Sequence, residues 1–427
     1  MTILERVNQS PYKAMYGRVV RFLRSKQQLT LRTLGEQIGF SHAFLRKVEM
    51  GQTAINAKVF NKINSALELE LIYDEALERD FFYWYEQYHL SNLYLDTLGK
   101  QEAYEQLRSN REQHQNSLWM DQYYIVELGA YIAKPFSDEA NIHQIFNDLS
   151  NIESLMDSKT LQIFLIYKGG YYFRINDMKR NRHTFIQAYE IGSNGRYGAL
   201  TLFLLGLSYA QTFSVHKSNR LLSRALEMFK AQNNEMRVFA TQIYMEFNHV
   251  LIGHYDQSEE MLKWGLDTAK RYELDGFANA IQIYLVIYYV KNQQYSHAKE
   301  QFETLNIKHL NDLFYEAYVN YKLNDYEGVL AAVDKAKPYI KKVHQHEFVD
   351  YYGILAVQAQ AEASLDDAEI EGLLKSFFDE AKQQNAYYQI DVAYDMYTEY
   401  LRRHRKYKSA YFLTLDMVKL TKKSFEL

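Results

Sequence analysis

The stretch from Leu29 to Gly51 carries the clearest helical pattern near the start of the chain. Apolar residues recur three or four positions apart there, as on the buried face of a helix: Leu34 and Ile38, then Leu45 and Val48. Each run begins after an N-capping residue and ends at a glycine, which adopts the left-handed conformation at little cost: Thr30 with Gly39, and Ser41 with Gly51. We therefore predict two short helices joined by a tight turn.

The exposed side of the second helix is small, polar or basic, and consists of His42, Ala43, Arg46 and Lys47. This is typical of the recognition helix of a helix-turn-helix, which inserts its first turns into the major groove of DNA. We predict that these four side chains face base edges and that three flanking residues contact phosphates: Ser41, Gln52 and Thr53. The alternative is an ordinary helical hairpin with a glycine turn, a common element of helical proteins.

Two flanking amphipathic stretches favour the helix-turn-helix. Residues 17–24 predict a preceding helix with Val20 and Leu23 inward, and residues 56–67 predict a following one with apolar residues at positions 59, 63 and 67. Residues 17 to about 69 therefore resemble the DNA-binding domain of the lambda-repressor/Cro class. In that class an internal arginine–glutamate ion pair occupies the positions of Arg24 and Glu49, so the resemblance implies a structural role for both.

The charge of the chain is divided unevenly. Residues 1–70 contain 11 lysines and arginines against 5 acidic residues, a net charge of +6, and the remainder contains 38 against 48, a net charge of −10. A basic first segment is expected to attract DNA phosphates, which the acidic remainder repels. Only 3 prolines and 18 glycines among 427 residues can interrupt helices, so we predict an all-α chain.

A short pattern recurs from about residue 95 to the end. Typically an aromatic or apolar residue is followed three positions later by an anchor residue, which is small or polar in most copies. An apolar residue usually lies four positions beyond the anchor. The anchors fall at Asn181, Ser218, Ser258, Ala298, Val329 and Ala410, with weaker copies at Ala103 and near Leu374 to Ala381. Paired helices with a period in this range match tetratricopeptide repeats, which stack into a superhelix with a concave groove. The alternative is an irregular helical bundle.

We therefore expect three segments. Residues 1–70 form the helix-turn-helix domain, residues 71–100 a connecting helix, and residues 101–427 the repeat domain for peptide binding and dimerisation. The connecting segment is dense in aromatic residues between Phe81 and Tyr88, which at helical spacing indicate a buried or dimer-facing helix. Residues 407–427 have no later repeat to cover their apolar side, so we predict a homodimer through the last repeat and this segment.

The sequence lacks the patterns of catalytic and metal sites. There is no cysteine, the glycine-rich stretch at residues 192–198 lacks the lysine and strand of a phosphate loop, and His344, His346 and Glu347 lack the spacing of a zinc motif. We therefore expect no catalytic residue, metal or cofactor, and no enzymatic activity. No apolar run approaches the ~18 residues of a membrane span, and the N-terminus does not read as a signal peptide. We expect a cytoplasmic protein with no membrane partner.

A lambda-repressor-type domain followed by degenerate tetratricopeptide repeats is the layout of the peptide-pheromone receptors of Gram-positive bacteria, the Rap, Rgg, NprR, PlcR and PrgX group. The chain resembles this group over nearly its whole length. Residues 224–266 and 324–335 resemble the arbitrium receptor of temperate phages, which senses a short secreted peptide and sets the choice between lysis and lysogeny. There an arginine and an asparagine eleven residues later hold the peptide, so the resemblance implies this role for Arg237 and Asn248. Alternatively, Asn248 is exposed or bonds two helices, and Arg237 is a surface charge.

These features favour a peptide-responsive transcription regulator of the quorum-sensing or lysis–lysogeny type. Its expected partners are a double-stranded DNA operator with inverted half-sites, a short linear signalling peptide and a second copy of the chain. Two alternatives stay open: a Rap- or NprR-like phosphatase or inhibitor of a response regulator, and a constitutive repressor with a helical oligomerisation body. By the resemblance, the Rap-type activity needs a three-helix bundle ahead of the repeats, where this chain has its basic helices.

Overall fold

The computed structural model describes residues 2–133, 139–212, 214–307, 309–340, 348–362, 365–384 and 386–425. All regular elements in these ranges are helices, as the sequence predicts. The chain divides into two compact units, which are described separately. The first unit contains residues 1–174 and 179–201, and the second contains residues 175–178 and 202–427.

Five helices form the first part of the first unit: α1 (Ile3–Val7), α2 (Tyr12–Lys26), α3 (Leu31–Ile38), α4 (His42–Glu49) and α5 (Ala57–Ala66). The predicted helix at residues 17–24 is longer than expected because it begins at Tyr12. Its inward side also differs, since Phe22 is buried and the predicted Leu23 is only partly covered. Helix α2 is packed on two sides by segments distant in sequence, so it buries residues that lie outside a single amphipathic stripe.

The local signals around α3 and α4 act as predicted. The Thr30 hydroxyl accepts the backbone N–H of Thr33 at 3.0 Å, and the Ser41 hydroxyl accepts that of Phe44 at 3.2 Å. Gly39 follows α3 with φ of 76°, in the left-handed region. These three signals confirm the predicted helix boundaries.

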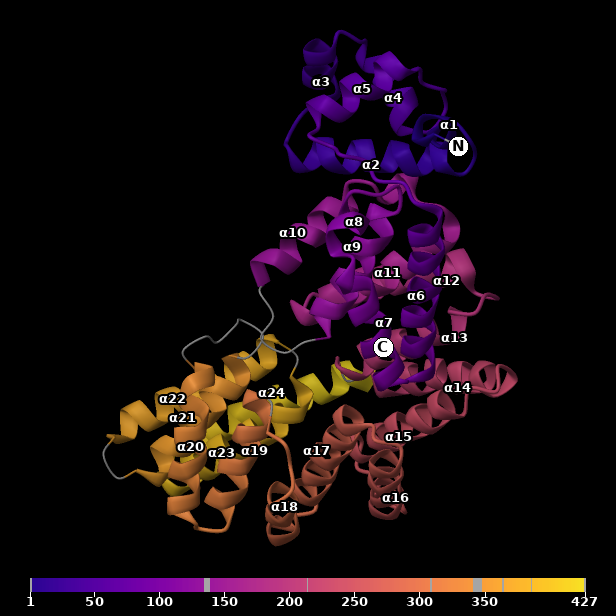
Figure 1. The fold of residues 1–427 in the computed structure, drawn as a ribbon. Coiled ribbons are helices and arrows are strands. Elements are labelled where there is room, and N and C mark those ends of the chain that lie inside the picture. The colour runs from indigo at the N-terminus through magenta and orange to yellow at the C-terminus, as the bar shows by residue number, and fades with distance from the viewer. Residues whose placement is uncertain are drawn as a thin grey trace. The chain divides into compact units, whose positions relative to one another are not determined.

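Helix α2 crosses α4 at very short range (Figure 1). A Cβ atom on Gly17 would lie 2.3 Å from the backbone oxygen of Glu49, so only glycine permits this approach. Beside the crossing, the Nε and Nη2 atoms of Arg24 contact the two carboxylate oxygens of Glu49 at 2.5 and 3.2 Å. The predicted Arg24–Glu49 ion pair is therefore present and holds the crossing.

The rest of the first unit consists of α6 (Glu75–Tyr94), α7 (Thr97–Ser109), α8 (Arg111–Gln115), α9 (Met120–Ile132), α10 (Glu139–Ser150), a 3-10 turn (Glu153–Leu155), α11 (Ser158–Arg174) and nearly all of α12 (Met178–Gly192). The aromatic segment forms α6, with Phe81, Tyr85 and Tyr88 buried and Tyr83 exposed. Phe81 packs on Trp119 with ring centroids 5.6 Å apart. The predicted aromatic helix is therefore mainly a core element of this unit.

Helix α2 is anchored to α9 by buried contacts. The Nε atom of Arg18 lies 2.6 Å from Oδ2 of Asp121, and their side chains are only 4% and 1% exposed. The ring of Phe22 stacks on that of Tyr124 at 5.0 Å. Helix α2 therefore packs both on the neighbouring short helices and on α9.

The second unit runs through α13 (Gly198–Ala210, from residue 202), α14 (Val215–Ala231), α15 (Glu235–Leu251), α16 (Ser258–Arg271), α17 (Asp275–Lys291), α18 (Tyr295–Phe302), α19 (Leu310–Lys322), α20 (Tyr326–Ile340), α21 (Phe348–Ala361), α22 (Asp367–Gln383), α23 (Tyr387–Arg403) and α24 (Tyr407–Phe425). From α14 to α24, consecutive helices pack side by side (Figure 1). The second unit is therefore a row of antiparallel helices.

The predicted repeat anchors are buried near the starts of alternate helices: Asn181 in α12, Ser218 in α14, Ser258 in α16, Ala298 in α18, Val329 in α20 and Ala410 in α24. Leu374 and Ala381, the ends of the weaker copy, are buried in α22. A Cβ atom on Gly265 of α16 would lie 2.4 Å from the Ile243 side chain of α15, so the small residue permits close packing. The repeat pattern therefore marks the contacts between paired helices.

Candidate functional site

Helix α4 presents the residues predicted to read DNA. His42, Ala43, Arg46 and Lys47 are all exposed, and among the flanking residues Ser41 and Gln52 are exposed and Thr53 is partly covered. The opposite side of α4 is buried through Leu45, Val48 and Glu49. The exposed side chains therefore project from a helix whose position is fixed by its core contacts.

The turn after α4 is held by its own hydrogen bonds. The backbone N–H of Gln52 donates to the Lys47 carbonyl at 2.8 Å, and the Thr53 hydroxyl donates to the Ala54 carbonyl at 3.3 Å. The Ser41 hydroxyl oxygen accepts a hydrogen bond in the α4 cap, and its O–H can still donate to a phosphate. The structure thus places all seven residues along α4 and its two ends, and their DNA contacts stay a prediction.

Asn248 lies on α15 and is only 1% exposed. Its Nδ2 donates to the Ser218 hydroxyl at 2.9 Å and to Oδ1 of Asn219 at 2.7 Å, both on α14. Both amide hydrogens are used, which leaves Oδ1 as the atom able to accept a peptide N–H. Asn248 therefore makes a bond between helices, and its expected peptide contact has to be made in addition to that bond.

Arg237 lies three turns earlier on α15 and is also buried. Its guanidinium carbon is 5.3 Å from the centroid of the Phe203 ring. Burial lowers the pKa of Arg237 to about 10, and the nearby Tyr244 acts in the opposite direction. The group stays charged at neutral pH, and a poorly hydrated cation of this kind interacts strongly with a carboxylate.

Aromatic side chains continue from Phe203 along α15 and α17. The Phe203 and Tyr244 rings are 5.4 Å apart, and Tyr244 lies 5.7 Å from Phe277. Phe247 stacks on Tyr284 at 3.8 Å. Arg237 therefore lies at one end of an aromatic row on α13, α15 and α17, in which Phe203 and Phe247 are buried and the other three rings are partly exposed.

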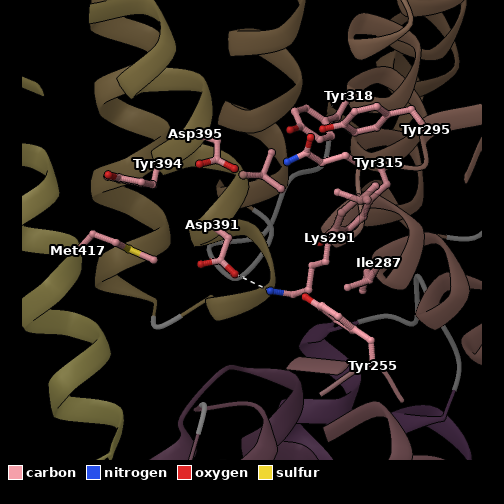
Figure 2. Close-up of a pocket in the computed structure, with 13 residues that line it drawn as sticks. Tyr255, Ile287, Lys291, Tyr295, Tyr315, Tyr318, Asp391, Tyr394, Asp395 and Met417 are labelled. Carbon is pink, nitrogen blue, oxygen red and sulfur yellow. Dashed lines mark hydrogen bonds and ion pairs between the residues drawn. The ribbon is translucent and has the colours of Figure 1, made fainter. Parts of the chain in front are cut away.

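A cavity of about 370 Å³ opens further along the second unit (Figure 2). One wall comes from α17, α18 and α19, with Lys291, Tyr295, Tyr315 and Tyr318, and the other comes from α23, with Asp391, Tyr394 and Asp395. No pattern singled out in the sequence pointed to this cavity. The available signal was Asp391, Asp395 and Glu399, three carboxylates spaced four residues apart on one helix face.

One ion pair joins the two walls of this cavity, and a second ion pair lies beside it. Nζ of Lys291 is 2.6 Å from Oδ2 of Asp391, and Nζ of Lys322 is 3.4 Å from Oε2 of Glu399. Asp395 lies between these two carboxylates on α23 and makes no ion pair with a described residue. Its partial burial and the nearby Asp391 raise the pKa of Asp395, because both disfavour its charged form.

The described residues contain no group of three or more histidine, aspartate or glutamate side chains arranged to hold a metal ion. His344, His346 and Glu347, which were considered as a metal motif, lie outside the described residues. No helix within the described part of the chain is long and apolar enough to cross a bilayer.

Neither protein-family models nor curated proteins gave a match to this chain. Solved structures did: a Rap protein in complex with competence and sporulation factor has a TM-score of 0.65 at 14% identity, covering 83% of this chain and 99% of that one. The apo form of the quorum sensor NprR from B. thuringiensis has a TM-score of 0.53 at 14% identity, covering 81% and 99%. NprR in complex with its cognate peptide NprX has a TM-score of 0.53 at 16% identity, covering 74% and 98%. At these identities the likeness concerns the fold.

Proposed function

We propose that this chain is a DNA-binding regulator whose affinity for an operator is set by a short linear peptide. The observation that carries the proposal is the combination of an exposed basic helix face, on α4, with a row of helix pairs. Two of the similar structures, the Rap protein and NprR, contain a peptide. We place the DNA contact on α4 and the peptide on α15 and its neighbours, and we assign the chain no catalytic step.

The arrangement of α4 supports the DNA-binding half of the proposal. Arg46 and Lys47 project from the side opposite the buried Leu45 and Val48, so their charged ends are free to enter a groove. Arginine and lysine recognise guanine through its O6 and N7 atoms. The positive charge of residues 1–70 adds attraction to phosphates that does not depend on sequence.

Replacing Arg46 by alanine is expected to weaken operator binding by about 1–3 kcal/mol and to reduce discrimination against other sequences, because a base contact is lost. An operator selected from random duplexes by the full-length chain provides the probe, and fluorescence anisotropy measures binding to it and to a scrambled duplex. Lys375→Ala, which removes an exposed charge on α22, is the matched control. A loss of equal size on both duplexes would reduce Arg46 to a phosphate contact.

We also propose a homodimer through α24, because one such domain covers too few base pairs for tight, specific binding. Tyr407, Tyr411 and Phe412 are each more than half exposed, and Val418 is 45% exposed on the same helix. Light scattering of the full chain is expected to give twice its mass of 50.6 kDa. Deleting residues 405–427 should return the monomer mass, and an unchanged dimer would place the interface elsewhere.

A further inference from the structure

The cavity between α17–α19 and α23 has an excess of negative charge. Its charged lining residues are Lys291, Asp391 and Asp395, so two carboxylates face one ammonium group. The neighbouring Lys322–Glu399 pair is balanced and does not correct the excess. A ligand that brings one positive charge would complete the set.

The tyrosines around the cavity provide a second reason to expect a cation. Five tyrosines line it: Tyr255, Tyr295, Tyr315, Tyr318 and Tyr394. The ammonium group of Lys322 already lies 5.8 Å from the Tyr295 ring centroid and 5.9 Å from that of Tyr318. The ring faces of this wall therefore attract cations, as the quadrupole of an aromatic ring predicts.

We propose that this cavity takes one lysine or arginine side chain of the bound peptide, which is held by Asp395 and displaces Lys291 from Asp391. The proposal rests on the peptide-dependent function proposed above and names the chemistry of the ligand. An arginine can bind a carboxylate through two parallel N–H groups, and an ammonium group binds as a point charge. Either fits a site in which the carboxylates lie one helical turn apart on α23 (Figure 2).

The Lys291–Asp391 pair gives the occupied cavity a structural consequence. The two residues are 100 positions apart in sequence and connect α17 to α23. Their side chains are 15% and 42% exposed, so the pair is partly solvated and contributes little to stability. A peptide cation that takes over Asp391 would release this link between distant helices. Ligand binding would thereby change which contacts hold the helix row together.

The test uses the full-length chain with N-acetyl-arginine-methylamide and, as the uncharged match, N-acetyl-citrulline-methylamide. NMR titration is expected to show at least tenfold tighter binding of the arginine probe. Asp395→Asn should remove this preference, whereas Asp379→Asn, an exposed carboxylate of α22 away from the cavity, should leave it unchanged. Lys291→Met should tighten binding of the arginine probe several-fold, because it removes the internal competitor for Asp391. Damage to the fold would weaken binding instead.

Two results would overturn the inference: equal binding of the two probes, or an unchanged preference in Asp395→Asn. Its failure can be told from failure of the proposed function by assaying operator binding with mixtures of short peptides that contain or lack a basic residue. If both mixtures regulate equally, the peptide-dependent function stands and the cation site is wrong. If neither regulates while the arginine probe still binds preferentially, the cavity stands and the proposed function is wrong.

Discussion

Replacing Asp121 by alanine is expected to destabilise the first unit by about 3–5 kcal/mol, because it leaves the buried guanidinium of Arg18 without its counter-charge. The two side chains are almost completely excluded from solvent, so water cannot take the place of the carboxylate. Urea unfolding followed by tryptophan fluorescence measures the loss. A Trp264→Phe background removes the tryptophan of the second unit and leaves Trp84 and Trp119 as reporters.

Two controls separate burial of charge from general damage. The double variant Arg18→Met with Asp121→Leu should recover most of the lost stability, since it removes both charges and fills the same space. Arg32→Ala breaks the Arg32–Glu36 pair, whose side chains are 84% and 67% exposed, and should cost under about 1 kcal/mol. If Asp121→Ala lowered the free energy of unfolding by as little as Arg32→Ala does, the Arg18–Asp121 pair would have to be solvated.

Replacing Arg237 or Asn248 by alanine is expected to abolish the effect of the peptide on operator binding while leaving peptide-free DNA affinity nearly unchanged. The coupling that would be lost is about 1–3 kcal/mol, a 5- to 150-fold change in operator affinity. Arg237 offers a buried cation to a peptide carboxylate, and Asn248 offers Oδ1 to a peptide N–H. Peptide titrations of the operator complex, with each variant and the parent chain, measure the change.

The control for Asn248 lies on the adjacent helix. Ser218→Ala removes one acceptor of the Asn248 amide and therefore weakens the bond between α14 and α15 without removing the amide. If Asn248 acts on the peptide, Ser218→Ala should keep most of the response that Asn248→Ala loses. A response lost equally in both variants would mean that Asn248 acts only by joining the helices, and a normal response in Asn248→Ala would contradict the peptide contact.

The sequence predicts the elements around α3 and α4 well because their signals are local. A capping hydroxyl at Thr30 or Ser41 and a glycine at position 39 act within one turn of the residues that they order. The repeat anchors are also visible in sequence, since most of the contacts between paired helices use a small or polar residue at a fixed place. The Arg24–Glu49 pair was predictable only by resemblance.

Contacts between distant segments were not predictable in this way. Arg18 and Asp121 are 103 residues apart, and neither has a neighbour in sequence that suggests its partner. The same holds for Lys291 and Asp391, which meet only when the seven helices from α17 to α23 are stacked correctly. The predicted peptide residues fall between these cases, because the resemblance implied Arg237 and Asn248 but could not show that both are buried.

Because α2 packs on α9, the first five helices cannot be cut out or exchanged as an independent domain. A fragment that ends near residue 70 would expose Phe22, which stacks on Tyr124, and would leave Arg18 without Asp121. Such a fragment carries a new apolar patch and is prone to self-association. The proposed DNA contacts are therefore better altered by replacing the exposed side chains of α4 than by swapping whole domains. A transplant that keeps α2 must bring α9 with it, because the surface that completes α2 is encoded some hundred residues downstream.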